Sequence, residues 1–97
     1  MAIEEIKKQI KFPITDKDLM ASNPDLLFQL EDELAKHTPI VTAQGEECAG
    51  GYTRTTREVH KYPDLGIEVI IDYIYINPPD DRRWGALSEV VRTFKEV

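Results

Sequence analysis

The sequence predicts one α+β domain in which helices pack against an antiparallel sheet of three strands, or of four. The first observation is a pair of strand-like segments, residues 52–62 and 67–76, separated by the turn sequence PDLG. The second is a stripe of leucines at helical spacing in residues 24–37, and the third is an apolar stripe in residues 82–96. Together they indicate the core order α-β-β-β-α within a single domain over residues 1–97.

The N-terminal segment fits two patterns. Residues 6–14 alternate between apolar and polar side chains, which favours a half-buried strand. Pro13 would place that strand at an edge of the sheet, because proline donates no hydrogen bond to a neighbour. The alternative is a helix, since Ile3, Ile6 and Ile10 also form a helical stripe. We favour the strand and keep the helix as the alternative.

Two helical segments follow. Asn23, followed by a proline, is a strong helix-start signal, and we expect a helix over residues 24–37. A short helical turn before it, residues 17–22, is capped by Thr15 or Asp16. The buried stripe of the longer helix comprises Leu26, Leu27, Leu30 and Leu34.

The remaining segments build the sheet and a last helix. Residues 40–44 are expected as a short strand and residues 45–51, GEECAGG, as a loop. Residues 67–76 have apolar side chains at both odd and even positions, so both faces of the strand would be apolar, which predicts the central strand. One face of that strand should pack on helices, and the other needs the N-terminal segment, a second copy or a partner. The expected stripe of the last helix is Trp84, Leu87, Val91 and Phe94.

The net charge of −6 lies entirely in residues 16–47. That segment holds eight acids and two bases, whereas the rest of the chain holds ten of each. An acidic surface repels nucleic acid and anionic membranes and attracts basic surfaces. We therefore expect neither direct nucleic-acid binding nor membrane binding, but a basic nucleic-acid-binding protein or complex as the partner.

The expected partner-binding residues are the acids of this segment and one aromatic side chain. On the helix 24–37, acids opposite the leucine stripe would face water about once per turn. Phe28 falls between two of them and is a potential interface anchor. The alternative is a solvated helix face whose early acids suit the helix dipole. The predicted set is Asp16, Asp18, Asp25, Phe28, Glu31, Asp32, Glu33, Glu46 and Glu47.

No catalytic residue, metal site or cofactor is expected. Cys48 is the only cysteine, so no intrachain disulfide can form, which fits a reducing cytoplasm. It has no evident activating base, and with His37 and His60 it is too scattered for a zinc site. The N-terminus lacks the apolar core of a signal peptide. We expect a cytoplasmic protein that is not an enzyme.

Two resemblances bear on function. The acidic stretch PDLLFQLEDELAKH with GEE, the small size and the lack of a catalytic motif resemble the small phage-encoded anti-CRISPR proteins that imitate DNA on a type I-F surveillance complex. This resemblance implies a non-enzymatic inhibitor in the host cytoplasm that binds Cas subunits and blocks target-DNA hybridisation. The element order is similar to that of double-stranded-RNA-binding domains, but the chain lacks their lysine-rich run, and we reject RNA binding.

A second functional interpretation belongs to a different class. The protein could be a small structural or assembly protein that forms a homodimer through the tyrosine-bearing face of the sheet. A nucleic-acid mimic can act as a monomer, and we favour the monomer. The oligomeric state therefore separates the two interpretations.

Overall fold

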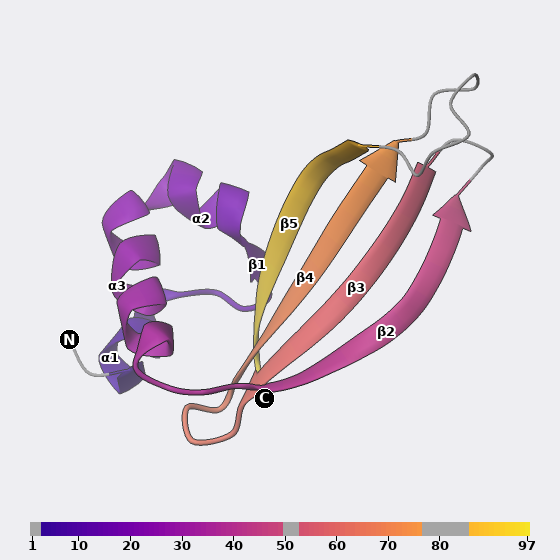
Figure 1. The fold of residues 1–97 in the computed structure, drawn as a ribbon. Coiled ribbons are helices and arrows are strands. Elements are labelled where there is room, and N and C mark those ends of the chain that lie inside the picture. The colour runs from indigo at the N-terminus through magenta and orange to yellow at the C-terminus, as the bar shows by residue number, and fades with distance from the viewer. Residues whose placement is uncertain (1–2, 50–52, 77–85) are drawn as a thin grey trace.

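The computed structural model describes residues 3–49, 53–76 and 86–97, with the side chains of residues 44–49, 53 and 86 excepted. Within these residues the chain forms three helices and five strands (Figure 1). In chain order they are α1 (Ile3–Gln9), β1 (Ile14–Thr15), α2 (Asp16–Ser22), α3 (Pro24–Ala35), β2 (Ile40–Ala49), β3 (Thr53–Tyr62), β4 (Ile67–Ile76) and β5 (Ala86–Glu96).

All five strands belong to one antiparallel sheet with the order β1-β5-β4-β3-β2. The predicted hairpin is confirmed: β3 and β4 pair from Tyr62 opposite Ile67, across a turn at residues 63–66. Gly66 has a φ of +66°, a left-handed conformation that favours glycine. The prediction of a central strand is also confirmed, because β4 lies third of the five.

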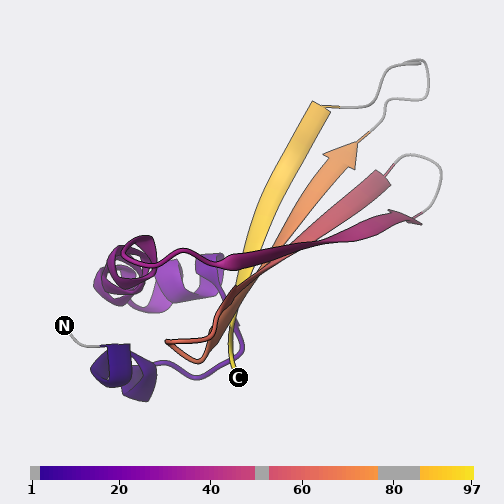
Figure 2. The same ribbon diagram turned by 60° about the horizontal axis from the view of Figure 1, so that its bottom comes forward.

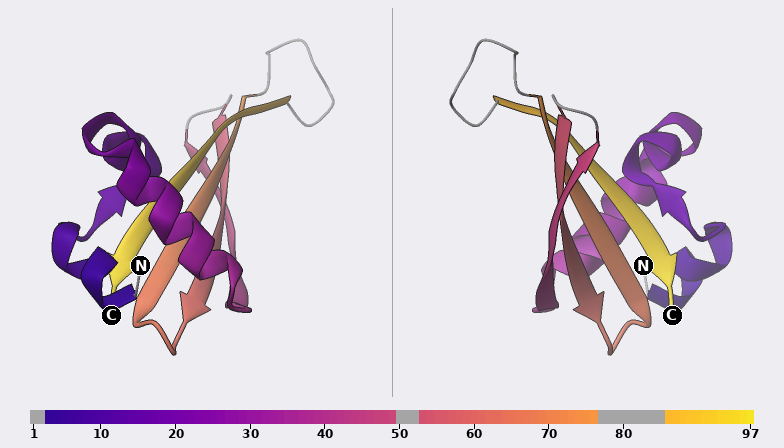
Figure 3. Two further views of the ribbon diagram at one scale, coloured as in Figure 1. Left: turned by 90° about the vertical axis from the view of Figure 1, so that its left-hand side faces the viewer. Right: turned by 90° about the vertical axis from the view of Figure 1, so that its right-hand side faces the viewer.

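The helices all lie on one face of the sheet and at one end of it (Figure 2). Helix α3 crosses this face obliquely, as the left view of Figure 3 shows. The core lies between the helices and this end of the sheet, where Ile67, Val69 and Phe94 are buried. Phe94 of β5 pairs with Val69 of β4, so both side chains point to the helices. The helical contributors are Ile6, Ile10, Leu19, Leu26, Leu27, Leu30 and Leu34.

The N-terminal segment is a helix, so the prediction of a strand over residues 6–14 was wrong. Helix α1 buries Ile6 and is followed by the buried Ile10, in line with the alternative helical stripe. Its Lys7 Nζ donates a hydrogen bond to the Leu65 carbonyl at 3.0 Å, which ties the helix to the β3–β4 turn. Only Ile14 and Thr15 form a strand, β1, which pairs with the end of β5.

The last element is a strand, so the prediction of a helix over residues 82–96 was wrong. Residues 82–85, including Trp84, lie outside the described part of the chain. In β5, Arg92 and Phe94 point to the helices while Val91 and Thr93 point away, which splits the expected helical stripe between two faces. The α+β class holds, but the sheet has five strands and the described chain does not follow the order α-β-β-β-α.

Strand β2 is also longer than predicted. The expected loop over residues 45–51 begins inside β2, which continues to Ala49. The register with β3 shifts between Gln44 and Glu47, as a β-bulge does when one strand carries an extra residue. Such a bulge accommodates Gly45 within a strand, where glycine signals a loop to sequence-based reasoning.

The sheet extends well past the helices, and the described chain measures 50 × 28 × 19 Å along its principal axes. We call residues 54–57, 72–76 and 87–91 the open half of the sheet, because none of their described side chains is buried. Leu87 and Ile76, both in this half, are 50% and 49% exposed. Burial in the described sheet is therefore concentrated at the end that the helices cover.

This division predicts unequal costs for two substitutions in β5. Phe94→Ala should lower the free energy of unfolding by about 3–5 kcal/mol, because it removes a fully buried ring from the core. Leu87→Ala, the control in the open half, should cost less than about 1 kcal/mol. Urea unfolding followed by circular dichroism measures both, with Phe94→Leu as a milder variant. Equal losses at the two positions would contradict the described core.

Candidate functional site

Helices α2 and α3 are fixed by side-chain caps at both of their N-termini. Thr15 Oγ1 accepts a hydrogen bond from the Asp18 amide at 3.2 Å, and Asn23 Oδ1 accepts one from the Leu26 amide at 3.2 Å. Asn23 also ends α2, since its amide donates to the Leu19 carbonyl at 2.8 Å. One residue therefore sets the angle between the two helices that carry most of the predicted binding residues.

The outer face of α3 carries two acids and an aromatic ring. Asp25, Phe28 and Asp32 are spaced at i, i+3 and i+7, on the side opposite the buried leucines. Phe28 is 51% exposed, as the sequence predicted. Neither acid makes an ion pair within the described residues, and the same holds for the exposed Asp18 on α2. We call Asp25, Phe28 and Asp32 the acidic helix face.

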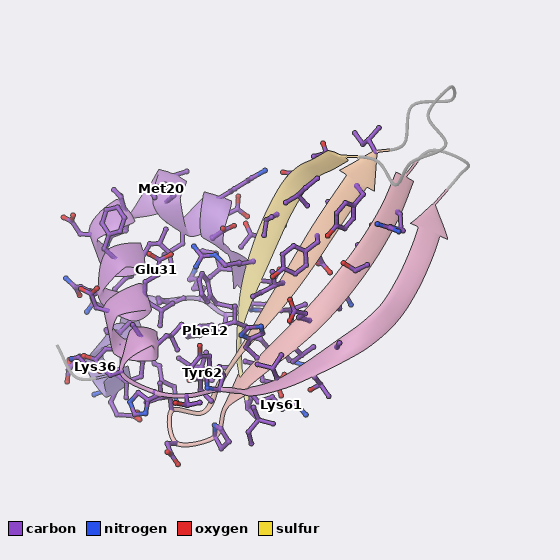
Figure 4. The ribbon with its side chains drawn as sticks, viewed as in Figure 1. Phe12, Met20, Glu31, Lys36, Lys61 and Tyr62 are labelled. Atoms are coloured by element: carbon purple, nitrogen blue, oxygen red, sulfur yellow. The ribbon has the colours of Figure 1, made fainter. Side chains whose placement is uncertain are left out.

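Two of the predicted surface acids instead point inward to Arg92. The guanidinium Nε of Arg92 lies 3.2 Å from Asp16 Oδ2, and its Nη2 donates a hydrogen bond to Glu31 Oε1. Figure 4 shows Glu31 on the side of α3 that faces the sheet. Burial lowers the pKa of Arg92, but the hydrogen bonds that the guanidinium donates to Glu31 and Asp16 outweigh this effect, and the pKa is raised overall. Asp16 and Glu31 are thus part of a bridge between the helices and β5.

A third predicted acid is balanced by a neighbour on its own helix. Lys36 Nζ donates a hydrogen bond to Glu33 Oε1 at 2.9 Å, and this bond lowers the pKa of the Glu33 carboxyl. The same contact raises the pKa of Lys36. Lys17 of α2 in turn pairs with Glu89 of β5. These contacts are exposed, so they change the local charge more than the stability.

Glu46 and Glu47 lie in β2 rather than in a loop, and their side chains are outside the described set. Glu47 pairs with Thr55 in the half of the sheet that the helices do not cover. The structure therefore does not bring these two acids to the acidic helix face. Of the nine predicted residues, those it leaves exposed and without a described cation on α2 and α3 are Asp18, Asp25, Phe28 and Asp32.

Two pockets of about 360 Å³ each lie on either side of the Arg92 bridge, and both are lined by Glu31 and Arg92. The outer pocket lies between α2, α3 and β5, with Ala21 and Leu27 in its lining. The inner pocket lies between α3 and the sheet. The rest of its lining is Leu34, Ala35, His60, Tyr62, Val69, Ile71 and Phe94.

Two polar side chains of β3 reach the inner pocket. His60 Nε2 is buried and has no hydrogen-bond partner, although Glu58 Oε2 lies 3.8 Å away. Burial raises the pKa of the Tyr62 phenol. Glu58 also hydrogen-bonds Tyr73, which raises the pKa of that phenol. Sequence reasoning considered His60 only as a base for Cys48 or as a scattered zinc ligand, and the pocket was not foreseen.

Arg92 was missed by sequence reasoning for a definable reason. In the expected helix its side chain had no assigned direction, whereas in β5 it points to the same face of the sheet as Phe94, toward the helices. The signal that could have found it is the shared parity of Val90, Arg92 and Phe94, which places all three side chains on one face of a strand. A cation beside a buried aromatic ring, with acids on the covering helices, indicates an ion pair.

The described residues contain no group of three or more His, Cys, Asp or Glu side chains placed to hold a metal ion. None of the described helices is both long enough and apolar enough to cross a membrane. Comparisons with protein-family models, curated proteins and solved structures found no match.

The Arg92 bridge predicts a loss of stability when its cation is removed. Arg92→Met retains an apolar stem but leaves Asp16 and Glu31 without their shared partner, and it should cost about 1–3 kcal/mol. The control is Arg57→Met, which breaks a pair with Asp72 whose Nε–Oδ1 distance is 2.7 Å, on the uncovered face of the sheet. That pair should contribute less than about 1 kcal/mol. Urea unfolding measures the loss of stability in both variants. An Arg92→Met protein as stable as the parent would refute the bridge.

Proposed function

We propose that the protein is a non-enzymatic binding protein whose acidic helix face occupies a basic, nucleic-acid-binding surface of a partner. The observation that carries the proposal is the half-exposed Phe28 between Asp25 and Asp32, which make no ion pair within the described residues. A partly exposed aromatic ring can anchor an interface when a partner desolvates it. Acids around it would steer the approach of a basic surface.

The internal ion pairs make this surface smaller than the sequence suggested. Asp16 and Glu31 share Arg92, and Glu33 faces Lys36, so two cations of the protein already engage these three acids before any partner arrives. The exposed acids Asp18, Asp25 and Asp32 remain available on α2 and α3. The proposal therefore rests on these three acids and Phe28 rather than on the whole acidic segment.

The spacing of these acids favours charge complementarity over a copy of the DNA backbone. Asp25 and Asp32 are seven positions apart, which is about 10 Å along a helix. Duplex DNA carries one charge for about every 1.7 Å of its axis. The acidic helix face is much sparser than a phosphate row, so apolar contact through Phe28 must contribute a large share of the affinity.

The resemblance to anti-CRISPR proteins suggests the first partner to test, the Cas subunits of a type I-F surveillance complex. In this role the protein would be an inhibitor that excludes target DNA from a basic channel. The homodimeric assembly protein is the second candidate, and the exposed Leu87, which pairs with Tyr75 on the tyrosine-bearing face of the sheet, favours it. Light scattering on the purified protein separates a monomer from a stable dimer.

The proposed function predicts that the free acids act together. A triple variant with Asp18→Asn, Asp25→Asn and Asp32→Asn should slow association with the purified surveillance complex by about tenfold at low salt, because steering is lost. The difference should shrink as salt rises, since screening acts over about 8–10 Å near physiological ionic strength. Surface plasmon resonance measures the rates.

The matched control removes the same number of charges elsewhere, through Glu4→Gln, Glu5→Gln and Asp64→Asn, all at exposed positions. Circular dichroism must show both triple variants folded. If the two triple variants associate at the same rate, only net charge matters and the acidic helix face is not the binding surface. If the parent protein does not bind the complex, the inhibitor proposal fails for this partner.

Phe28 should act on dissociation rather than on association. Phe28→Ala removes the proposed anchor, and the off-rate should rise at least about tenfold, which corresponds to a contact worth about 1.4 kcal/mol or more. This effect should depend little on salt, because the lost contact is apolar. Leu87→Ala, an equally exposed apolar residue in the open half of the sheet, is the control and should leave the off-rate unchanged.

A further inference from the structure

The inner pocket has the composition of a small-molecule site. Its volume of about 360 Å³ lies in the lower part of the range of roughly 300–1,000 Å³ that ligand pockets occupy. Val69, Ile71 and Phe94 of the sheet form an apolar floor, and Leu34 of α3 lies opposite. A ligand that fills the pocket would therefore bury an apolar body against the core.

His60 adds an unsatisfied polar atom to this apolar lining. Its Nε2 is buried and makes no hydrogen bond. A buried polar group without a partner is unfavourable, so a ligand that hydrogen-bonds this atom recovers part of that cost. Glu58 Oε2 lies 3.8 Å from the same nitrogen, and its carboxylate is held by Tyr73. A group with several donors can reach both His60 and Glu58.

The charges around the pocket favour a cation. Glu31 lines the pocket and Glu58 lies beside it, and Asp16 is bonded to the Arg92 that closes one end. Arg92 is shared by Asp16 and Glu31, and Glu58 lies outside that ion pair, so the carboxylates around the pocket outnumber the guanidinium. An anion entering the pocket would meet two carboxylates, whereas an ammonium group would be attracted by them.

We propose that the inner pocket binds a primary ammonium group carried on an apolar stem. The stem lies on Val69, Ile71 and Phe94, and the ammonium donates to His60 Nε2 and to the Glu58 carboxylate. This site lies between α3 and the sheet and does not use the acidic helix face, so it goes beyond the proposed function. The same chemistry is offered by a free amine and by a lysine side chain of a protein.

The first test titrates the protein with three probes at neutral pH while recording ¹H–¹⁵N correlation spectra. The probes are phenethylamine, phenylacetate of similar size and opposite charge, and Nα-acetyl-lysine N-methylamide. Phenethylamine should shift the amides of His60, Tyr62 and Ile71 and bind at least about ten times more tightly than phenylacetate. Binding of the lysine derivative in addition indicates a protein side chain as the source, and its failure to bind indicates a free amine.

Two variants localise the effect. Ala35→Phe places a ring at the rim of the inner pocket and should abolish the shifts. Ala21→Phe makes the same change in the outer pocket, on the other side of Arg92, and should leave the shifts intact. His60→Leu should weaken phenethylamine at least about tenfold, by removing the acceptor from a retained apolar wall. Each variant is first checked for a native-like spectrum.

Several outcomes would overturn the proposal. These are no shift at the pocket amides, equal affinity for phenethylamine and phenylacetate, or shifts that survive Ala35→Phe in a folded protein. None of these outcomes tests binding to the surveillance complex, since the acidic helix face is unchanged in all three variants. Failure of the pocket and failure of the proposed function are therefore distinguishable.

Discussion

The fold depends on a mismatch of length between its two layers. Helix α3 has 12 residues and spans about 18 Å, whereas the ten-residue strands span about 33 Å. The helices can therefore cover only one end of the sheet, and burial follows that limit: Val69 is buried, but Tyr73 on the same face of β4 is only partly so. A five-stranded sheet is stabilised here by a core at one end and by strand pairing along its whole length.

Arg92 lies where the covered part of the sheet meets the open half, and this position explains its contacts. Arg92 pairs with Ile71 of β4, two residues along β5 from the fully buried Phe94 and on the same face. At this position an apolar side chain would be partly exposed to water, whereas a cation can still reach two carboxylates. The guanidinium also lies 5.7 Å from the Phe94 ring. The bridge ties β5 to α2 and α3 and leaves a pocket on each side of it. It also divides the acids of the chain into those that hold the layers together and those that a partner can contact.

Sequence reasoning succeeded where the signal was local and failed where one apolar spacing fits two structures. The PDLG turn and Asn23 define their elements by backbone chemistry, and both predictions hold. Ile6 and Ile10 share a strand parity and also a helix face, so only packing against the core decides between the two. The exposure of Phe28 followed from the leucine stripe of its own helix. The inward orientation of Glu31 could not be predicted from that stripe, because it depends on Arg92. The direction of Arg92 in turn depends on β5 being a strand.

The open half of the sheet also constrains how the protein can associate. On the face away from the helices, the Arg57–Asp72 pair lies between Ile70 and Ile74, and Glu68 stands between Lys61 and Lys95 across three strands. Self-association through this face would have to desolvate these charges, which costs more than it returns unless every charge finds a partner.

The opposite face presents Tyr73, Tyr75 and Leu87, with Arg54 stacked 4.7 Å from the Tyr75 ring, and it has the less costly surface to bury. The β-bulge of β2 disrupts pairing at the far edge. Any homodimer is therefore expected to use the tyrosine-bearing face beside α3, which would leave the acidic helix face free for a different partner.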